Sequence, residues 1–273
     1  MAWGTFNIDG ASYDNKYKSV SSEALDPSGV FFKPDGTKMY VSKEAGIYQY
    51  ALSTAWDVST ASYETKSISA TYIKDIALSS DGTKIFYLYV NSTTHRIYYA
   101  TLSTAWDIAT VGSFSYKDIS GCVPRYAYGM YFTPNGTKLY VGGYYSTTVQ
   151  VAQFSMSTAW DASGLTYVGV ADLSGTTTGV TGLSMNDTGT KMYCVGYSCI
   201  IYQFSLSTAY NITTASYDSK SFDATAQGST IGGMYFKPDD GSKFYIVNNG
   251  TDAVYQYSSY AVNTFLPQLM MCS

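Results

Sequence analysis

The sequence predicts an all-β protein, a five-bladed β-propeller with four-stranded antiparallel blades. Two observations predict this fold. A tight turn and a longer loop recur together along the chain, and the N-terminus supplies the strand that the last repeat lacks. A period of about 50 residues with short strands and no helical pattern is typical of propeller blades.

The repeat consists of a glycine-containing turn followed by a tryptophan-containing loop. The turn reads DGTK at 35–38 and 81–84, NGTK at 135–138, TGTK at 188–191 and DGSK at 240–243. The loop reads LSTAWD at 52–57 and 102–107, MSTAWD at 156–161 and LSTAYN at 206–211. The turn glycines are separated by 46, 54, 53 and 52 residues, so a unit of nearly constant length is repeated.

The first repeat divides into four expected strands. They are strand A at 29–33, strand B at 38–42, strand C at 46–51 and strand D at 62–69. Pro34 presets φ and Gly36 accepts a positive φ, so a tight turn is predicted between strands A and B. The next three repeats cover 75–120, 129–174 and 182–223, and the fifth begins at Gly233.

The two ends of the chain are expected to complete one blade together. The fifth repeat stops matching after 254–259 and lacks a fourth strand, whereas residues 2–21 resemble the end of a repeat at 55–69. The N-terminal strand, within 11–21, should therefore pair with C-terminal strands and close the ring. We expect one domain over 1–261, followed by an apolar tail at 262–273.

Composition narrows the classes of partner. Charged residues make up 13% of the chain and the net charge is −4, so the basic surface that nucleic acid requires is absent. An anionic membrane surface is disfavoured for the same reason. We see no secretory signal and no apolar run long enough for membrane insertion, and we therefore expect synthesis in a cytoplasm. Tyrosine is abundant, at 29 residues, which suits strands.

The residues for metal or nucleophilic chemistry are sparse. The only histidine, His95, is expected in a hairpin loop without a partner serine motif. The four cysteines form no CxxC pair, so no zinc site is predicted. Cys194 and Cys199 are interpreted as buried thiols rather than a disulfide, as a reducing compartment favours. No glycine-rich phosphate loop precedes a helix. We predict no metal and no cofactor.

The repeated aromatic residue of the loop has two interpretations. Its ring could be a stacking platform for a sugar in each blade, or it could pack in the wedge between neighbouring blades while the adjacent Asp binds loop amides. The second interpretation is favoured. The positions are Trp56, Trp106, Trp160 and Tyr210.

A candidate ligand site is found where the repeats differ. Four A strands begin with glycine, whereas the second begins with Asp75, preceded by Lys74. Strand A should line the central channel, so these residues are expected near a channel mouth, on the face that carries the irregular B–C and D–A connections. Together with neighbouring D–A loops the candidate site comprises Glu23, Asp26, Lys74, Asp75, Arg125 and Tyr126. The alternative, which the residue types favour, is a solvated rim or a Lys74–Asp75 ion pair.

The phrase FKPDGTKMYV…IYQYALSTAWDVSTASY resembles the propeller repeats of tailed bacteriophage structural proteins and of related bacterial surface proteins. The resemblance covers 2–260. It implies a virion-associated fibre, tail or decoration component, made in the host cytoplasm, that binds other virion proteins and a host surface glycan, with a homo-oligomer allowed. It brings no catalytic motif that can be transferred to this chain.

Three functions follow from these observations. The first is a non-enzymatic virion module for attachment, because Tyr-rich surfaces bind glycans and proteins at low entropic cost. The second is a lectin that uses the repeated loops. The third is a glycoside hydrolase, which needs two carboxyl groups at a set distance. Of the glutamates only Glu23 is placed to join Asp26 and Asp75, because Glu44 is expected in a hairpin turn and Glu64 in an outer strand.

Overall fold

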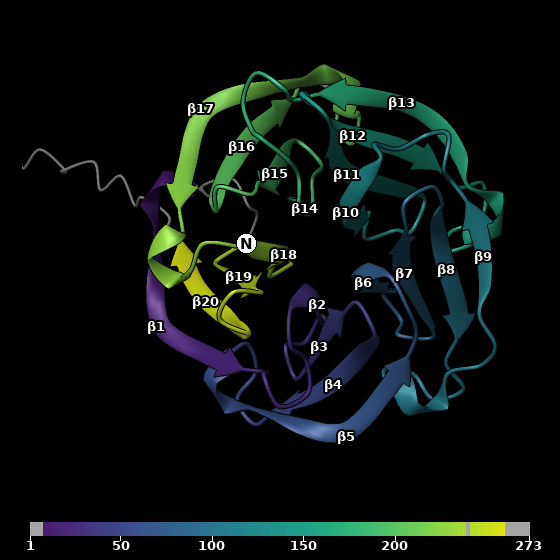
Figure 1. The fold of residues 1–273 in the computed structure, drawn as a ribbon, viewed down its shortest axis with the longest axis vertical. Helices are drawn as coiled ribbons and strands as arrows, with labels where there is room; N and C mark the ends of the chain where they lie inside the picture. The colour runs from purple at the N-terminus through teal and green to yellow at the C-terminus, as the bar shows by residue number, and fades with distance from the viewer. Residues whose placement is uncertain (1–7, 239–240, 260–273) are drawn as a thin grey trace, which may run out of the picture.

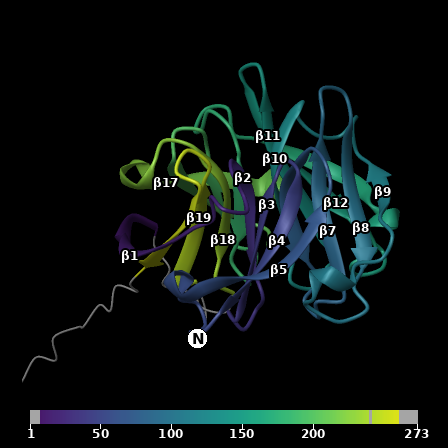
Figure 2. The same cartoon turned by 60° about the horizontal axis from the view of Figure 1, so that its bottom comes forward.

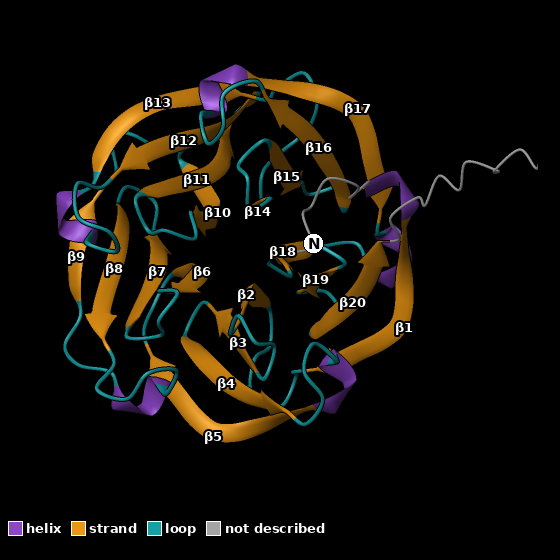
Figure 3. Cartoon of the chain, turned by 180° about the vertical axis from the view of Figure 1, so that it is seen from behind, coloured by secondary structure: helices purple, strands orange, loops and turns teal. Residues whose placement is uncertain are grey.

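The chain folds as five four-stranded antiparallel sheets around a central axis, as the repeats predict (Figure 1). The computed structural model describes residues 8–238 and 241–259. The predicted tail at 262–273 therefore lies outside the described residues. In each sheet the strand that comes first in the repeat is innermost, and the fourth strand forms the rim. Figure 3 shows the same ring from behind, with the fourth strands of the sheets along its rim.

The strands agree with the expected boundaries to within two residues in the first blade. Its strands are β2 (Pro27–Phe32), β3 (Lys38–Lys43), β4 (Gly46–Leu52) and β5 (Ala61–Ser69). The second blade contains β6 (Ile73–Leu78), β7 (Lys84–Val90), β8 (His95–Thr101) and β9 (Ser115–Asp118). His95, which was expected in a hairpin loop, is instead the first residue of β8 and is buried.

The remaining blades follow the same order. The third contains β10 (Tyr126–Phe132), β11 (Lys138–Tyr145), β12 (Thr148–Ser155) and β13 (Thr166–Asp172). The fourth contains β14 (Gly182–Met185), β15 (Lys191–Val195), β16 (Ile200–Leu206) and β17 (Ala215–Asp223). The fifth contains β18 (Ile231–Phe236), β19 (Lys243–Asn248), β20 (Ala253–Ser259) and β1 (Ala11–Ser19). Cys194 and Cys199 are buried free thiols, as predicted.

Short 3-10 turns, which the sequence did not indicate, follow the repeated loops. They are η2 (Val58–Thr60), η3 (Ile108–Thr110), η4 (Ala162–Gly164) and η5 (Ile212–Thr214), with η1 (Ile8–Gly10) before β1 and η6 (Thr225–Gln227) before β18. The residue after the loop aromatic caps each of the first four. Asp57, for example, accepts from Ser59 N at 3.2 Å. Capping by an Asp or Asn side chain explains why the loop keeps one of these residues in the first four repeats.

The A–B turns and the C–D loops interlock on one side of the ring, which we call the repeat face. Trp56 has a φ of 63°, and its ring covers Gly36, where an added Cβ would lie 2.5 Å from the ring atoms. The ring also stacks at 5.9 Å on Phe32 of its own blade and at 6.4 Å on Tyr245 of blade five. The wedge interpretation of the loop aromatics is therefore confirmed for this tryptophan.

Buried glutamines join consecutive blades. Gln49 Oε1 accepts from Ile108 N at 3.0 Å in the next blade, while its amide donates to Glu64 at 2.7 Å in its own blade. Gln256 does the same between blades five and one, because its Oε1 accepts from Val58 N at 3.0 Å. Within the part of the chain that the structure describes, five clusters of buried apolar residues also pack the ring.

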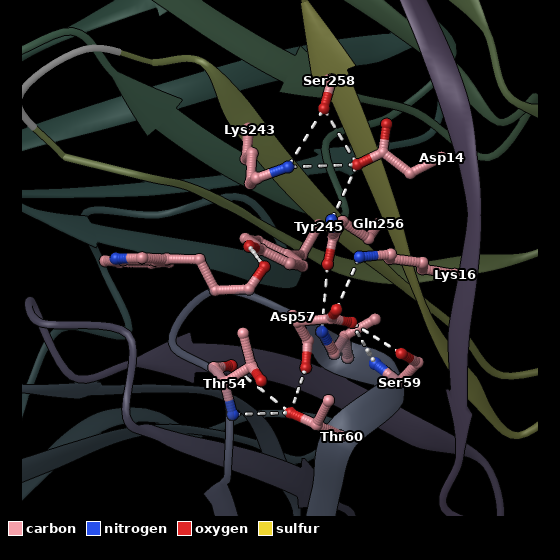
Figure 4. A network of polar contacts seen from close by, with 12 residues as sticks. Asp14, Lys16, Thr54, Asp57, Ser59, Thr60, Lys243, Tyr245, Gln256 and Ser258 are labelled. Atoms are coloured by element: carbon pink, nitrogen blue, oxygen red, sulfur yellow. Dashed lines mark hydrogen bonds and ion pairs between the residues drawn. The ribbon is translucent and has the colours of Figure 1, made fainter.

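The N-terminal strand closes the ring, as predicted. β1 pairs antiparallel with β20 from Ala11↔Ser259 to Ser19↔Ala253. One oxygen of Asp14 accepts from Gln256 at 2.7 Å, Ser258 at 2.9 Å and Lys243 at 3.3 Å (Figure 4). Lys16 reaches the first blade, where it binds Asp57 at 2.5 Å. The last blade is thus fastened to its neighbour by side chains of its N-terminal strand.

Candidate functional site

The five innermost strands approach one another most closely at one level of the channel. This glycine layer consists of Gly29, Asp75, Gly129, Gly182 and Gly233. A Cβ added at Gly182 would lie 2.7 Å from Met234 N, and one added at Gly233 would lie 2.9 Å from Gly29 Cα. A side chain at Gly182 or Gly233 would collide with the neighbouring backbone, and one at Gly129 would lie tightly, at 3.1 Å, against Gly182 Cα, which explains the glycine at these positions.

Asp75 occupies the remaining position of the glycine layer and fills the space above Gly29. A Cβ added at Gly29 would lie within 2.4 Å of Asp75 Oδ1. Oδ1 accepts from Ile76 N and Oδ2 accepts from Met130 N, both at 2.8 Å. Innermost strands have a partner on one side only, so their free edges present N–H groups to the channel. The Asp75 carboxylate satisfies two of these N–H groups.

Burial dominates the electrostatics of this carboxyl group. Asp75 is 5% exposed, and desolvation raises its pKa well above the usual range of an aspartic acid, against the opposing effect of the Met130 and Ile76 hydrogen bonds. Lys74 does not pair with it. The ammonium group of Lys74 lies 5.9 Å from the ring centre of Tyr128. The Lys74–Asp75 ion pair, one of the alternatives for these residues, is therefore not formed.

A cavity lies on each side of the glycine layer. The first, of about 360 Å³, is lined by residues just before the layer and by B–C and D–A connections. We call the side on which it opens the variable face and the space the variable-face cavity. The second, of about 290 Å³, is lined by residues after the layer and by A–B turns, and we call it the repeat-face cavity. In Figure 2 the B–C hairpins of blades two and three project at the top, on the variable face.

The variable-face cavity is polar and borders a cluster of tyrosines. Its walls include Lys43, Glu44, Lys74, Thr181 and Asn249. Asn249 Oδ1 is buried and has no hydrogen-bond partner among the described residues. Such an orphaned acceptor is costly unless a ligand or water donates to it.

The tyrosine cluster joins blades three and four beside the cavity. Tyr197 makes edge contacts with Tyr128 at 5.8 Å and Tyr144 at 5.2 Å, and Tyr126 stacks on Tyr144 at 5.0 Å. Burial, followed by hydrogen bonding to Tyr128, raises the pKa of Tyr197, so its hydroxyl stays protonated at neutral pH. Tyr145 lies next to this cluster and is 52% exposed.

The predicted site residues do not form a single pocket. Lys74 and Asp26 line the variable-face cavity. Glu23 accepts instead from the Tyr50 hydroxyl at 3.1 Å. Asp75 was expected on the same side as Lys74, but it lines the repeat-face cavity. The expectation was wrong because Asp75 lies in the layer where the backbones meet, and its carboxylate turns toward the N–H groups beyond that layer.

The other two predicted residues belong to the tyrosine cluster. The Arg125 guanidinium lies 5.7 Å from the ring centres of both Tyr126 and Tyr145. The Arg125 carbonyl is bound by His95 Nε2 at 2.7 Å, which fixes the loop. Sequence reasoning missed Tyr128, Tyr144 and Tyr197. The available signal was that their blades carry tyrosines in the D–A and B–C connections, at YAYG and GGYY in one blade and GYSC in the next.

Two negative findings concern the described residues alone. No group of three or more His, Cys, Asp or Glu side chains gathers there in a way that could hold a metal ion. None of the helices in 8–238 or 241–259 has the length and apolarity needed to cross a membrane.

Comparisons with known proteins agree with the fold. No family model matches the chain, and no curated protein matches its sequence. A solved structure described as a nidogen/laminin complex aligns with a TM-score of 0.51 at 13% identity, covering 84% of this chain and 74% of that chain. The β-propeller domain of Myceliophteria thermophila Cps50 (Swd1) aligns with a TM-score of 0.49 at 10% identity, covering 92% and 100%. At 13% identity the first likeness concerns the fold alone, and the chain's own five four-stranded sheets show that it is an all-β, five-bladed β-propeller.

Proposed function

We propose that this chain is a non-enzymatic binding module of a bacteriophage particle that attaches to carbohydrate through its variable face. The observation that carries the proposal is the exposed tyrosine–arginine surface of Arg125, Tyr126 and Tyr145 beside a polar cavity. Sugars combine apolar C–H faces with many hydroxyl groups, so aromatic rings next to amide, ammonium and carboxylate groups suit them. The phage assignment rests on the resemblance of the repeat.

The alternative lectin, with one sugar per repeated loop, has less support. The ring of Trp56 is covered on one side by Gly36 and stacks on Tyr245 of the neighbouring blade, and the Lys237 ammonium lies 5.8 Å from its centre. A sugar would have to displace these contacts. Tyr145 on the variable face is 52% exposed, so a sugar reaches its ring with less displacement of neighbouring groups.

The glycoside hydrolase hypothesis required Glu23, Asp26 and Asp75 to act together. Asp26 lines the variable-face cavity, Asp75 lies beyond the glycine layer, and Glu23 is bound to Tyr50. The three carboxyl groups that the hypothesis named are therefore not gathered at one site, which lessens its support.

A binding experiment tests the proposal with a matched control. Tyr145→Ala removes a ring that is 52% exposed beside Arg125, and Tyr116→Ala removes a ring that is 51% exposed on the outer strand β9, where Arg96 lies 4.1 Å from its centre. A bound glycan would cover the Tyr145 ring, so we expect glycan-array binding to fall about tenfold or more for Tyr145→Ala. Binding should stay unchanged for Tyr116→Ala.

The outcomes separate the parts of the proposal. Equal effects of the two substitutions, or no bound glycan, would contradict attachment through the variable face. Binding that falls only with Trp56→Ala, in a variant that still folds, would favour the repeated loops. Electron microscopy of intact particles tests the location, because absence of the propeller from virions would remove the phage assignment.

A further inference from the structure

The repeat-face cavity has apolar walls on all five sides. The residue that follows the glycine layer is apolar in every blade: Val30, Ile76, Met130, Leu183 and Met234. Further out, aromatic side chains such as Phe31, Tyr131 and Tyr235 line the space. The volume of about 290 Å³ is close to the lower end of ligand-binding pockets, so it suits a single ring with a short substituent.

The charged groups of this cavity that the structure describes have one sign. Of the described residues that line it, two are charged, and both are acidic: Asp75 in the glycine layer and Asp187 in the A–B turn of blade four. Two lysines of the same face lie elsewhere. Lys33 and Lys237 are placed 5.9 Å and 5.8 Å from the ring centres of Trp106 and Trp56. The described walls therefore offer acidic side chains and no basic one inside an apolar space, which favours a cationic ligand over an anionic one.

The Asp75 carboxylate has hydrogen-bonding capacity left for a ligand. It accepts two backbone N–H groups, whereas an ionised carboxylate offers about four acceptor sites. No cationic side chain is bound to it among the residues that the structure describes. A buried carboxylate without a counter-charge is unfavourable, and a bound cation would relieve this cost.

We propose that the repeat-face cavity binds a small organic cation, a primary ammonium group on a flat apolar body. The ammonium group would donate to Asp75, and the body would lie against the methionines and aromatic rings that surround it. Aromatic faces attract cations, and methionine side chains adapt to ligand shape, so both the charge and the walls suit this class. The site is separate from the proposed carbohydrate surface, which opens on the other side of the glycine layer.

The test compares three probes of one shape and different charge. Benzylammonium, benzyl alcohol and benzoate are titrated into the intact chain by isothermal calorimetry, with ligand-induced shifts followed by NMR. We expect benzylammonium to bind about tenfold or more tightly than benzyl alcohol, and benzoate not to bind.

Asp75→Gly is the central variant because four blades already carry glycine at this level. It should weaken benzylammonium about tenfold, leave benzyl alcohol within about threefold, and allow benzoate to bind, because Ile76 N and Met130 N then face the cavity. Lys74→Ala, on the variable-face side, should change none of these affinities. If the glycine variant does not fold, Asp75→Asn removes the charge at nearly constant volume.

The proposal is overturned if benzylammonium binds the wild type and an uncharged Asp75 variant equally well. It is also overturned if the wild type binds no benzylammonium at about 10 mM, where even a weak millimolar ligand is largely bound. Loss of benzyl alcohol binding together with benzylammonium would show that Asp75 shapes the walls rather than binding charge, and would equally contradict the inference.

Discussion

The closure of the ring by β1 gives the sharpest prediction about stability. Asp14→Ala removes one oxygen that accepts from Gln256 at 2.7 Å, Ser258 at 2.9 Å and Lys243 at 3.3 Å. The Asp14 side chain is 13% exposed, so solvent replaces these bonds poorly. The variant leaves the Gln256 amide without its acceptor, and Gln256 is also the residue that holds Val58 N of blade one.

The expected loss follows from these contacts. A hydrogen bond to a charged group contributes about 1.5–3 kcal/mol when its partner is left buried and unpaired, as for Gln256. Lys243, whose side chain is 30% exposed, adds less than about 1 kcal/mol, and Ser258 can turn to water. We expect the free energy of unfolding to fall by about 2–4 kcal/mol, measured by urea denaturation with CD and fluorescence.

The matched control is Asp218→Ala in blade four. Asp218 accepts from the same residue types, Gln203 and Lys191 at 2.7 Å and Ser205 at 2.5 Å, but its strand β17 is covalently continuous with β16. We expect a similar loss of global stability. Hydrogen exchange should differ, because β1 is joined to β20 only by non-covalent contacts and can open locally.

The assay therefore reads the exchange of strand amides. In Asp14→Ala the amides of β1 should exchange about 100-fold faster, while in Asp218→Ala those of β17 should follow the global stability alone. A loss below about 1 kcal/mol in Asp14→Ala, or unchanged exchange of β1, would refute the idea that this carboxylate fastens the last blade.

Three further predictions concern the repeat face and the channel. Gly36→Ala should lower the free energy of unfolding by about 1–3 kcal/mol, because the φ of Gly36 is +74° and an added Cβ would lie 2.5 Å from the Trp56 ring. Thermal unfolding measures this loss, and an unchanged midpoint would contradict the prediction. Tyr40→Phe should lower the free energy of unfolding by about 1 kcal/mol, because it loses the 2.8 Å hydrogen bond to the next blade. The fold should be kept, since Phe86 already occupies the equivalent position in blade two. Urea denaturation of Tyr40→Phe measures this loss of stability. Desolvation raises the folded-state pKa of Asp75, so the folded state binds this proton more tightly than the unfolded chain does. The stability of the wild type, relative to that of Asp75→Asn, should therefore rise as pH falls from 7 toward about 4. A difference in unfolding free energy between the two proteins that does not vary with pH would contradict this.

Much of the fold was predictable from the sequence because each signal is local. The turn glycines have positive φ, as the DGTK pattern requires, and the Asp of the STAWD loop caps a turn within two residues of itself. The closing strand was predicted within 11–21 and is found at Ala11–Ser19, since it keeps the repeat's own sequence. Glu64, expected in an outer strand, lies in β5 and binds Lys38 at 2.8 Å.

The candidate site was predicted less well because its parts meet through the ring. Arg125 was placed correctly in a D–A connection, but the sequence alone did not pair it with Tyr145, which lies one hairpin away. Glu23 was expected at the same pocket, yet the Tyr50 hydroxyl holds it. Such partners depend on which loops the blades bring together, and no short-range pattern specifies this.

The sequence by itself determined the number of blades, the closing strand and the division into a repeated and an irregular face, because these follow from repeat length and turn chemistry. Only the tertiary structure decided that the channel is divided at the glycine layer and that Lys74 and Asp75, neighbours in sequence, line opposite cavities. The physical reason is the approach of five backbones at the axis. There the Asp75 carboxylate finds N–H groups of two blades, whereas Lys74 remains on the side of the tyrosines.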